Sequence, residues 1–161
     1  MKPRFLILAG ATAAAVVTVG AMAQQSDSDQ IVENLTFLGE TVTADMIVKG
    51  QGIYAENCAS CHGANLEGQP DWQRRLANGR MPAPPHDETG HTWHHSDRNL
   101  FIVTKRGIGS IIPGYESDMP VFEEILSDDE IAAVLAYIKS TWPERQSEFQ
   151  AEVSANDKGG L

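Results

Sequence analysis

The chain has 161 residues, a length that suits one domain with a short appendage. Its 12 basic and 22 acidic residues leave a net charge of −10 at pH 7. No nucleic-acid partner is expected, because phosphate binding needs clustered lysine and arginine. Hydrophobic residues at 42% and charged residues at 21% exclude global disorder. Aromatic residues make up only 7%, so a bound cofactor could supply apolar volume that the core lacks.

The first residues have the form of an export signal. Two basic residues precede an uncharged apolar run over residues 5–19, and Ala21-Met22-Ala23 supplies a cleavage site of small residues. This pattern predicts a secretory signal peptide over residues 1–23 and therefore a periplasmic, exported protein. The alternative is an uncleaved membrane anchor, since the apolar segment approaches the roughly 20 residues that span a bilayer. Its glycines and alanines make it a weak span.

Residues 24–42 are interpreted as an N-terminal extension, polar at first and then scattered with apolar residues to which the pattern assigns no structure. Thr43 is a suitable N-cap for a helix from Ala44 to about Ala55. Gly50 lies in the middle of that helix, where glycine costs about 1 kcal/mol relative to alanine. We therefore expect another segment to cross the helix closely at Gly50.

Glycine and proline are frequent in residues 63–95, which predicts a long loop. A loop of this length is uncommon in a compact domain unless it is functional or wraps something. A short helix over residues 97–106 follows, capped by Ser96 or Asp97 and ended by a glycine. Residues 107–119 form a second irregular stretch.

The last predicted helix begins with the capping box Ser127-Asp128-Asp129-Glu130. Apolar residues follow at helical spacing from Ile131 to Ile138, and the helix stops before Pro143. The polar residues 144–161 are interpreted as a flexible tail. Three helices and two long loops, without an alternating strand pattern, predict an all-α domain over residues 43–143 that wraps around a central body.

Cys58-Ala59-Ser60-Cys61-His62 is the motif with the clearest chemistry. Two thiols three residues apart on a helical turn can add to the two vinyl groups of one haem, and His62 then lies under the ring with a nitrogen aimed at the iron. A zinc site would need four ligands, and the chain has no second cysteine pair. A thioredoxin-like pair would need a βαβ context. We therefore predict covalent haem c on Cys58 and Cys61, with His62 as the proximal ligand.

The sixth ligand of the iron decides the function, because methionine or histidine makes an electron carrier and an empty position makes an oxygen or peroxide site. Met119 is the preferred candidate, since it lies in an irregular loop before the capped helix and Pro120 stiffens its exit. Met46 falls on the apolar stripe of the first helix and is expected in the core. The candidates that stay open are Met81, His86, His91, His94 and His95.

These features together resemble a monohaem class I cytochrome c of the bacterial periplasmic type over about residues 43–142. Gly50 and Tyr54 precede the motif as that family's first-helix glycine and aromatic residue do. Asp118-Met119-Pro120-Val121-Phe122 is similar to the family's distal-ligand loop, and residues 127–138 are similar to its C-terminal helix. The resemblance implies three main helices and long loops around one haem, with the C-terminal helix crossing the first helix at the glycine.

The resemblance also implies thioether links to both cysteines of the motif and the axial pair His62 and Met119. In that family, a proline carbonyl accepts the second ring proton of the proximal histidine, which fixes the orientation of the imidazole. Pro84 is the best match to that proline, and Pro85 is the next. The segment 82–95 is longer and richer in histidine than in a minimal member of the family.

Four histidines follow one another closely in this segment, together with several acidic residues. One interpretation is a second metal site, for copper in particular, since imidazoles and carboxylates suit that metal. Another is a pH-sensitive surface. The third is that loop histidines pack beside Trp93 near the haem or face solvent. The spacing matches no helical metal motif, which favours the third interpretation. The four residues are His86, His91, His94 and His95.

The sequence therefore predicts a periplasmic carrier of single electrons on a His/Met-ligated haem, acting to or from a respiratory-chain partner such as an oxidase or a dehydrogenase. Its acidic charge indicates that the docking patch of this partner is basic or apolar. Contact with a membrane is expected only if residues 1–23 stay uncleaved. The alternatives are a haem-based sensor or peroxidase-like enzyme with a labile sixth ligand, and a metal-delivery module that uses the histidine segment.

Overall fold

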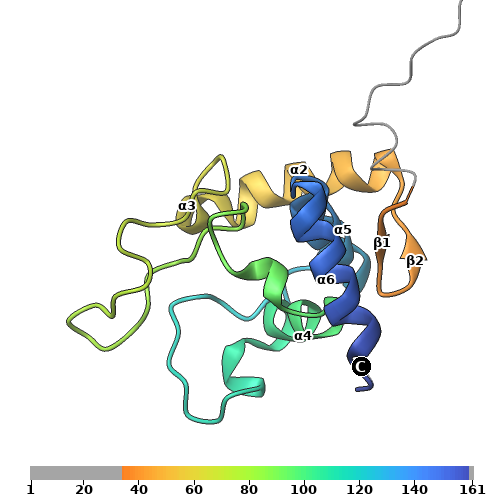
Figure 1. Cartoon of the computed structure of the whole chain (residues 1–161). Helices are drawn as coiled ribbons and strands as arrows, with labels where there is room; N and C mark the ends of the chain where they lie inside the picture. Colours follow the sequence, from red (N-terminus) through yellow and green to blue (C-terminus); the bar gives the residue numbers. More distant parts are fainter. Residues whose placement is uncertain (1–33, 160–161) are drawn as a thin grey trace, which may run out of the picture.

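The computed structural model describes residues 34–159, which are mainly helical (Figure 1). The signal peptide predicted for residues 1–23 lies outside this range. A short antiparallel hairpin comes first, with Thr36 opposite Thr41. The elements are β1 (Thr36–Phe37), β2 (Glu40–Thr41), α2 (Ala44–Asn57), α3 (Ala59–His62), α4 (Asp97–Arg106), α5 (Asp128–Ser140) and α6 (Glu144–Asn156), with 3-10 turns η1 (Thr92–His94) and η2 (Ile108–Ser110).

The three helices that the sequence predicts are present and begin at the predicted caps. Thr43 at α2 and Ser96 at α4 each accept a hydrogen bond from the backbone amide three residues further on. Ser127 forms a complete capping box with Glu130 at α5. Each cap satisfies a backbone N–H that has no partner within the helix. Within residues 34–159, none of the helices has the length and hydropathy needed to cross a membrane.

Helix α5 crosses α2 at Gly50. A Cβ atom at this position would lie 2.0 Å from the carbonyl oxygen of Ala133 and 2.9 Å from the Cβ of Tyr137, so no side chain fits. One turn further along α2, the rings of Tyr54 and Tyr137 pack with their centroids 5.6 Å apart. The close crossing predicted at Gly50 is confirmed. It holds the helix that leads into the Cys58–His62 motif against α5.

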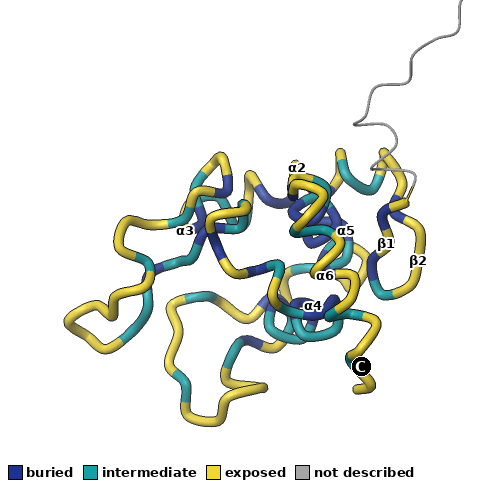
Figure 2. The backbone as a smooth tube through the Cα atoms, viewed as in Figure 1, coloured by how far each residue is buried: buried dark blue, intermediate teal, exposed yellow. Residues whose placement is uncertain are grey.

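Buried residues are concentrated around α5, whereas the two long loops are largely exposed (Figure 2). Ile131 and Ala136 on α5 have no exposed surface, and Trp142 just after it is 2% exposed. Met46 packs against this core, as its place on the helix stripe predicts. The core therefore forms a rigid body at one side of the cysteine motif, and the loops extend from it.

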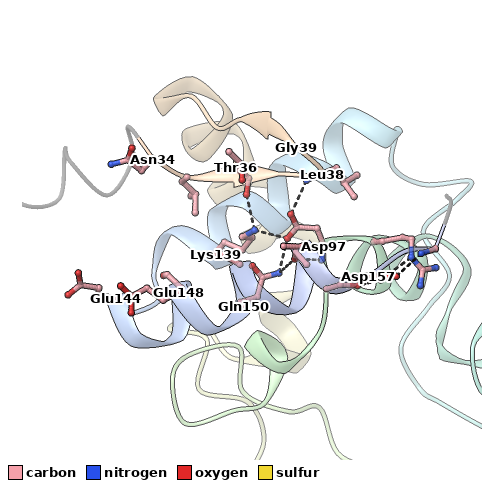
Figure 3. Close-up of a pocket in the computed structure, with 18 residues that line it drawn as sticks. Asn34, Thr36, Leu38, Gly39, Asp97, Lys139, Glu144, Glu148, Gln150 and Asp157 are labelled. Carbon is pink, nitrogen blue, oxygen red and sulfur yellow. Dashed lines mark hydrogen bonds and ion pairs between the residues drawn. The ribbon is translucent and has the colours of Figure 1, made fainter.

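Residues 144–156 form α6, so the prediction of a flexible tail is wrong for this segment. Gln150 on α6 is fully buried and donates from Nε2 to the Asp97 carboxylate (2.8 Å) and to the carbonyl of His95 (3.1 Å) (Figure 3). Helix α6 is thus held by polar contacts to residues distant in the sequence. Because it lacks the strong apolar stripe of most surface helices, the periodicity of its sequence does not predict the helix.

The hairpin also belongs to the folded body. Lys139 on α5 forms a buried ion pair with Asp97 (2.6 Å) and donates to the Thr36 carbonyl (2.8 Å). The amide of Leu38 donates to the other carboxylate oxygen of Asp97 (2.9 Å) (Figure 3). The folded domain thus begins before the predicted boundary at residue 43. The buried apolar side chains of this segment are Leu35, Phe37 and Val42.

Candidate haem site

The cysteine motif occupies the turn where Cys58 joins α2 to α3. The amide of Cys58 donates to the Tyr54 carbonyl (2.9 Å), and the Cys58 carbonyl accepts from the amides of Cys61 (3.1 Å) and His62 (2.9 Å). The spacing of three residues places both cysteines on one face of this turn. Both are free thiols, Cys58 half-buried and Cys61 exposed. Burial, together with the nearby Cys61, raises the pKa of Cys58 to about 11.

His62 has one ring nitrogen engaged and the other open. Its Nδ1 lies 2.9 Å from the carbonyl oxygen of Pro84. Because a carbonyl oxygen only accepts, Nδ1 carries the hydrogen and Nε2 carries the lone pair. No described residue forms a hydrogen bond with Nε2. Burial lowers the pKa of His62, and the bond to Pro84 opposes that shift. The ring is therefore a neutral imidazole, which is the form that binds a metal.

The Pro84 carbonyl is held in place by the chain on both sides of it. A Cβ atom at Gly68, which has a φ of +69°, would lie 2.4 Å from the nitrogen of Pro85. The amide of His86 donates to the Leu66 carbonyl (2.7 Å), and the amide of Gly68 donates to the His62 carbonyl (2.7 Å). Residues 66–68 therefore connect the proximal histidine to the proline segment. Only glycine at position 68 allows the two segments to come so close.

The ring of His86 stacks on the ring of His62, with centroids 4.0 Å apart and planes 21° apart. His86 Nδ1 lies 2.8 Å from Thr92 Oγ1, and the Thr92 hydroxyl lies 3.3 Å from the Pro85 carbonyl. Since the hydroxyl donates to that carbonyl, it accepts from the Nδ1–H of His86. Burial, with smaller contributions from His62 and His91, holds the pKa of His86 well below its usual value. The stacked ring is therefore neutral at pH 7.

The other three histidines of this segment do not converge. His91 stacks on Trp72 (centroids 5.2 Å apart) and meets His95 edge-on at 5.4 Å. His94 packs against Trp93 at 3.8 Å. Among residues 34–159, no group of three histidine, cysteine or acidic side chains is placed to hold a metal ion. This arrangement gives the hypothesis of a second metal site no support, because His91 and His94 pack on tryptophan rings.

Met119 lies in the loop between α4 and α5. Its side chain is half-buried and packs against the core, and its amide donates to Ser117 Oγ (3.1 Å). Three residues later, the amide of Phe122 donates to the Thr104 carbonyl at the end of α4 (3.3 Å). Phe122 is buried. The methionine is thus placed close to an anchored point of an otherwise exposed loop.

The two long loops are tied to each other near Met119. Arg80 forms an ion pair with Asp118 and a weaker one with Glu116 (3.8 Å). The guanidinium of Arg75 lies over the ring of Tyr115, 5.9 Å from its centroid. Met81, the other methionine considered from the sequence, follows Arg80 directly. These contacts join the segment after the cysteine motif to the loop that carries Met119.

The same loops expose large apolar side chains. Four of them, which lie on the two tied loops, are between 38% and 49% exposed. Apolar side chains suit contact with the faces of a porphyrin, just as the two free thiols suit its vinyl groups and the open Nε2 suits its iron. The residues present therefore fit a haem. The four apolar residues are Leu76, Ile111, Ile112 and Val121.

Comparison with known proteins identifies the family. The sequence description of the cytochrome c family matches residues 47–142, which is more than half of the chain. The chain belongs to the cytochrome c family. The all-α cytochrome c fold and the covalent haem c predicted from the sequence are confirmed by this match. Membership of this family supports a role in electron transfer.

Two curated relatives are larger proteins than this chain. The chain is 30% identical over 110 residues to the Cbb3-type cytochrome c oxidase subunit CcoP of Azospirillum brasilense, covering 68% of this chain and 33% of that protein. It is 29% identical over 136 residues to a nitrite reductase of Stutzerimonas stutzeri, covering 76% of this chain and 22% of that protein. The chain thus spans a third or less of each relative. No solved structure gives a significant match.

Two residues near the motif have roles that sequence reasoning missed. For His86, the sequence suggested an iron ligand, a second metal site, a pH-sensitive surface or a loop residue that packs near the haem or faces solvent, and nothing local indicates that its ring stacks on His62. Arg80 carries no signal beyond its position next to Met81. The groove of Figure 3, about 1080 Å³ in volume, lies elsewhere, since its lining includes Asp97, Lys139 and Gln150 but no residue of the cysteine motif.

Proposed function

We propose that this cytochrome c is a periplasmic protein that carries single electrons, with His62 and Met119 as the axial ligands of its haem. The observation that carries the proposal is the state of the His62 ring. Its Nδ1–H is held by the Pro84 carbonyl, and its Nε2 is left without a partner among the described residues, directly after the two free cysteines. When bound, the haem iron supplies a one-electron couple.

The role of the protein is to hold the surroundings of that couple fixed in both oxidation states. His62 is held by the Pro84 carbonyl and by the stacked ring of His86. Met119 is the distal ligand that we propose, because its side chain packs against the core and its loop is tied by the Arg80–Asp118 ion pair. Small movement of the ligands keeps the reorganisation that accompanies electron transfer small.

The net charge of −10 supports a partner with a basic or apolar docking patch, since opposite charge guides the encounter. Several of the basic residues are already paired with carboxylates: Lys49 with Glu130, Lys105 with Asp128, and Arg106 with Glu123. A respiratory oxidase or dehydrogenase is the partner class that we propose, and one of the two relatives is an oxidase subunit. The signal peptide predicted for residues 1–23 supports export.

A second candidate function is a haem-based sensor or peroxidase-like enzyme in which Met119 leaves the iron. Two observations favour it. Most of the loop from Gly109 to Asp118 is exposed, and the second relative is named a nitrite reductase. No acid or base is positioned by the contacts of Met119, whose amide bonds only to Ser117. The carrier is therefore the function that the geometry supports best.

Cyclic voltammetry of the haem-loaded protein, together with rapid mixing with two small oxidants, tests this proposal. We expect one reversible one-electron wave. Attraction to the acidic protein should speed its oxidation by the cation cobalt tris-phenanthroline, and repulsion should slow its oxidation by the anion ferricyanide. Both effects should shrink as salt is added. A catalytic current on addition of nitrite or hydrogen peroxide, larger than that of free haem, would contradict the carrier and support the enzyme.

A further inference from the structure

The histidine segment holds one imidazole whose position differs from that of its neighbours. His86 is the only one of the four histidines whose ring is stacked on a residue of the cysteine motif. Its backbone is fixed at both ends of the residue. The amide donates to the Leu66 carbonyl (2.7 Å), and the carbonyl accepts from Trp142 Nε1 (2.8 Å). The ring therefore stands on a backbone that the core holds in place.

The ring of His86 is fixed as well. Its Nδ1–H donates to Thr92 Oγ1 (2.8 Å), and the edge of the ring faces Tyr54, with centroids 6.4 Å apart. Thr92 is buried and anchored in turn on the Pro85 carbonyl (3.3 Å). A side chain with its hydrogen bond, its ring edge and its backbone all engaged has little freedom to turn. It presents a rigid flat face to His62.

His62 needs a second restraint. The hydrogen bond from Nδ1 to the Pro84 carbonyl fixes one point of the ring, but the ring can still tilt about that point. A flat neighbour 4.0 Å away, with its plane inclined by 21°, removes this freedom. The orientation of the imidazole plane above a haem sets its overlap with the iron orbitals, and such restraints on a metal-bound histidine tune the metal.

We propose that His86 is a positioning residue, which fixes the plane of the proximal His62 ring by stacking on it and thereby sets the electronic state of the haem iron. The proposal rests on the proposed function only in taking His62 as the axial ligand. It assigns a role to one residue of the histidine segment that is neither metal binding nor simple packing. The ring is what matters in this role, and its hydrogen bond to Thr92 serves to hold the ring.

Two substitutions separate the ring from the hydrogen bond. His86→Asn keeps a donor near the position of Nδ1 but removes the aromatic face. His86→Phe keeps a flat ring but loses the bond to Thr92. A third variant, Thr92→Val, keeps the volume of the threonine and removes the hydroxyl that orients His86, without touching either ring. Thr92→Val tests the proposal if the variants at position 86 do not fold.

The measurement is the proton NMR spectrum of the ferric, haem-loaded protein, in which the shifts of the haem methyl groups depend on the orientation of the axial imidazole. The reduction potential is measured alongside. We expect His86→Asn to change the order or spread of the methyl shifts and to move the potential. His86→Phe and Thr92→Val both keep a flat ring at position 86 and lose its bond to Thr92, so each should move in the same direction by a smaller amount. Unchanged shifts and potential in His86→Asn, or in Thr92→Val where the former does not fold, would overturn the proposal.

The wild-type spectrum separates this result from the fate of the proposed function. If the wild-type ferric protein shows a low-spin haem with histidine and methionine ligands, the carrier stands whatever the variants at position 86 do. A change of the same size in both His86→Asn and His86→Phe would contradict the role of the ring and leave only a packing role for His86.

Discussion

The carbonyl oxygen of Pro84 lies 2.9 Å from Nδ1 of His62, although the two residues are 22 positions apart in the sequence. The loop between them brings the contact about through the close approach of Gly68 to the Pro84–Pro85 peptide bond. The hydrogen bond leaves the Nε2 lone pair free and makes the imidazole a stronger electron donor. The contact therefore links the conformation of a surface loop to the properties of the haem iron.

Gly68→Ala is expected to push Pro84 away from His62 and to raise the reduction potential, because a weaker hydrogen bond makes His62 a poorer donor to ferric iron. Gly79→Ala is the matched control. Both glycines have positive φ (+69° and +85°), but a Cβ atom at Gly79 meets nothing within 4 Å. Both variants should lose roughly 1–2 kcal/mol of stability from backbone strain. Equal potentials in the two variants would show that Gly68 does not position Pro84.

Gly50→Ala tests the crossing of α2 and α5. The added Cβ would meet the Ala133 carbonyl oxygen at 2.0 Å, so the helices must separate. We expect a loss of about 1–3 kcal/mol in the free energy of unfolding, which is typical of an overpacked core. Gly52→Ala on the same helix has open space and should gain about 0.5–1 kcal/mol. Urea unfolding of the haem-loaded variants measures both values.

The Asp97–Lys139 ion pair is buried, with each side chain at most 7% exposed. Asp97→Asn leaves the Lys139 ammonium without its counter-charge and should cost about 3–5 kcal/mol. Lys139→Met leaves the Asp97 carboxylate buried and should cost a similar amount. The double variant Asp97→Asn with Lys139→Met should be more stable than the sum of the two single effects predicts. Strict additivity in a double-mutant cycle would show that the two groups do not interact.

Asp157 holds the end of α6 against the start of α4. Its carboxylate accepts hydrogen bonds from Arg98 and Ser96 and from the amide of Gly159, which together lower its pKa from 3.8 to about 2. A folded-state pKa below the unfolded one contributes stability above about pH 4 that is lost as the pH falls towards 2. Asp157→Asn should therefore flatten the dependence of the melting temperature on pH in this window. An identical slope in the variant and the wild type would contradict the role of Asp157.

Arg80 joins the loop of Met119 to the loop of the proximal side through Asp118. Arg80→Gln should loosen the Met119 loop and lower the urea concentration at which carbon monoxide begins to bind the ferrous protein. The effect is expected to be modest, because the pair is exposed and such pairs contribute about 0–1 kcal/mol. Arg74→Gln, on the same loop, is the control. The same urea concentration for the onset of binding in the wild type and both variants would show that the pair does not restrain Met119.

Local patterns in the sequence predict the motif and the helices that frame it. The spacing of Cys58, Cys61 and His62 lies within one turn, and the caps at Thr43 and Ser127 act on residues close by. A glycine in mid-helix requires a close crossing, and that requirement predicts the role of Gly50. In each case, the physical cause lies within a few residues of the signal.

Long-range polar contacts are what the sequence does not show. Helix α6 is held by the buried amide of Gln150, which leaves only a weak apolar stripe to detect. The strands β1 and β2 have two residues each, too few for an alternating pattern. The stacking of His86 on His62 depends on Leu66 and Thr92, which no spacing rule connects.

The visible spectrum of the ferrous protein, recorded at neutral pH with and without carbon monoxide, tests the His62 and Met119 ligation most directly. The account predicts an unchanged spectrum for the wild type, because methionine already occupies the sixth position, and an immediate shift for Met119→Ala. Met81→Ala should behave as the wild type does. A shift in the wild-type protein on addition of the gas, or a closed site in Met119→Ala, would contradict the account.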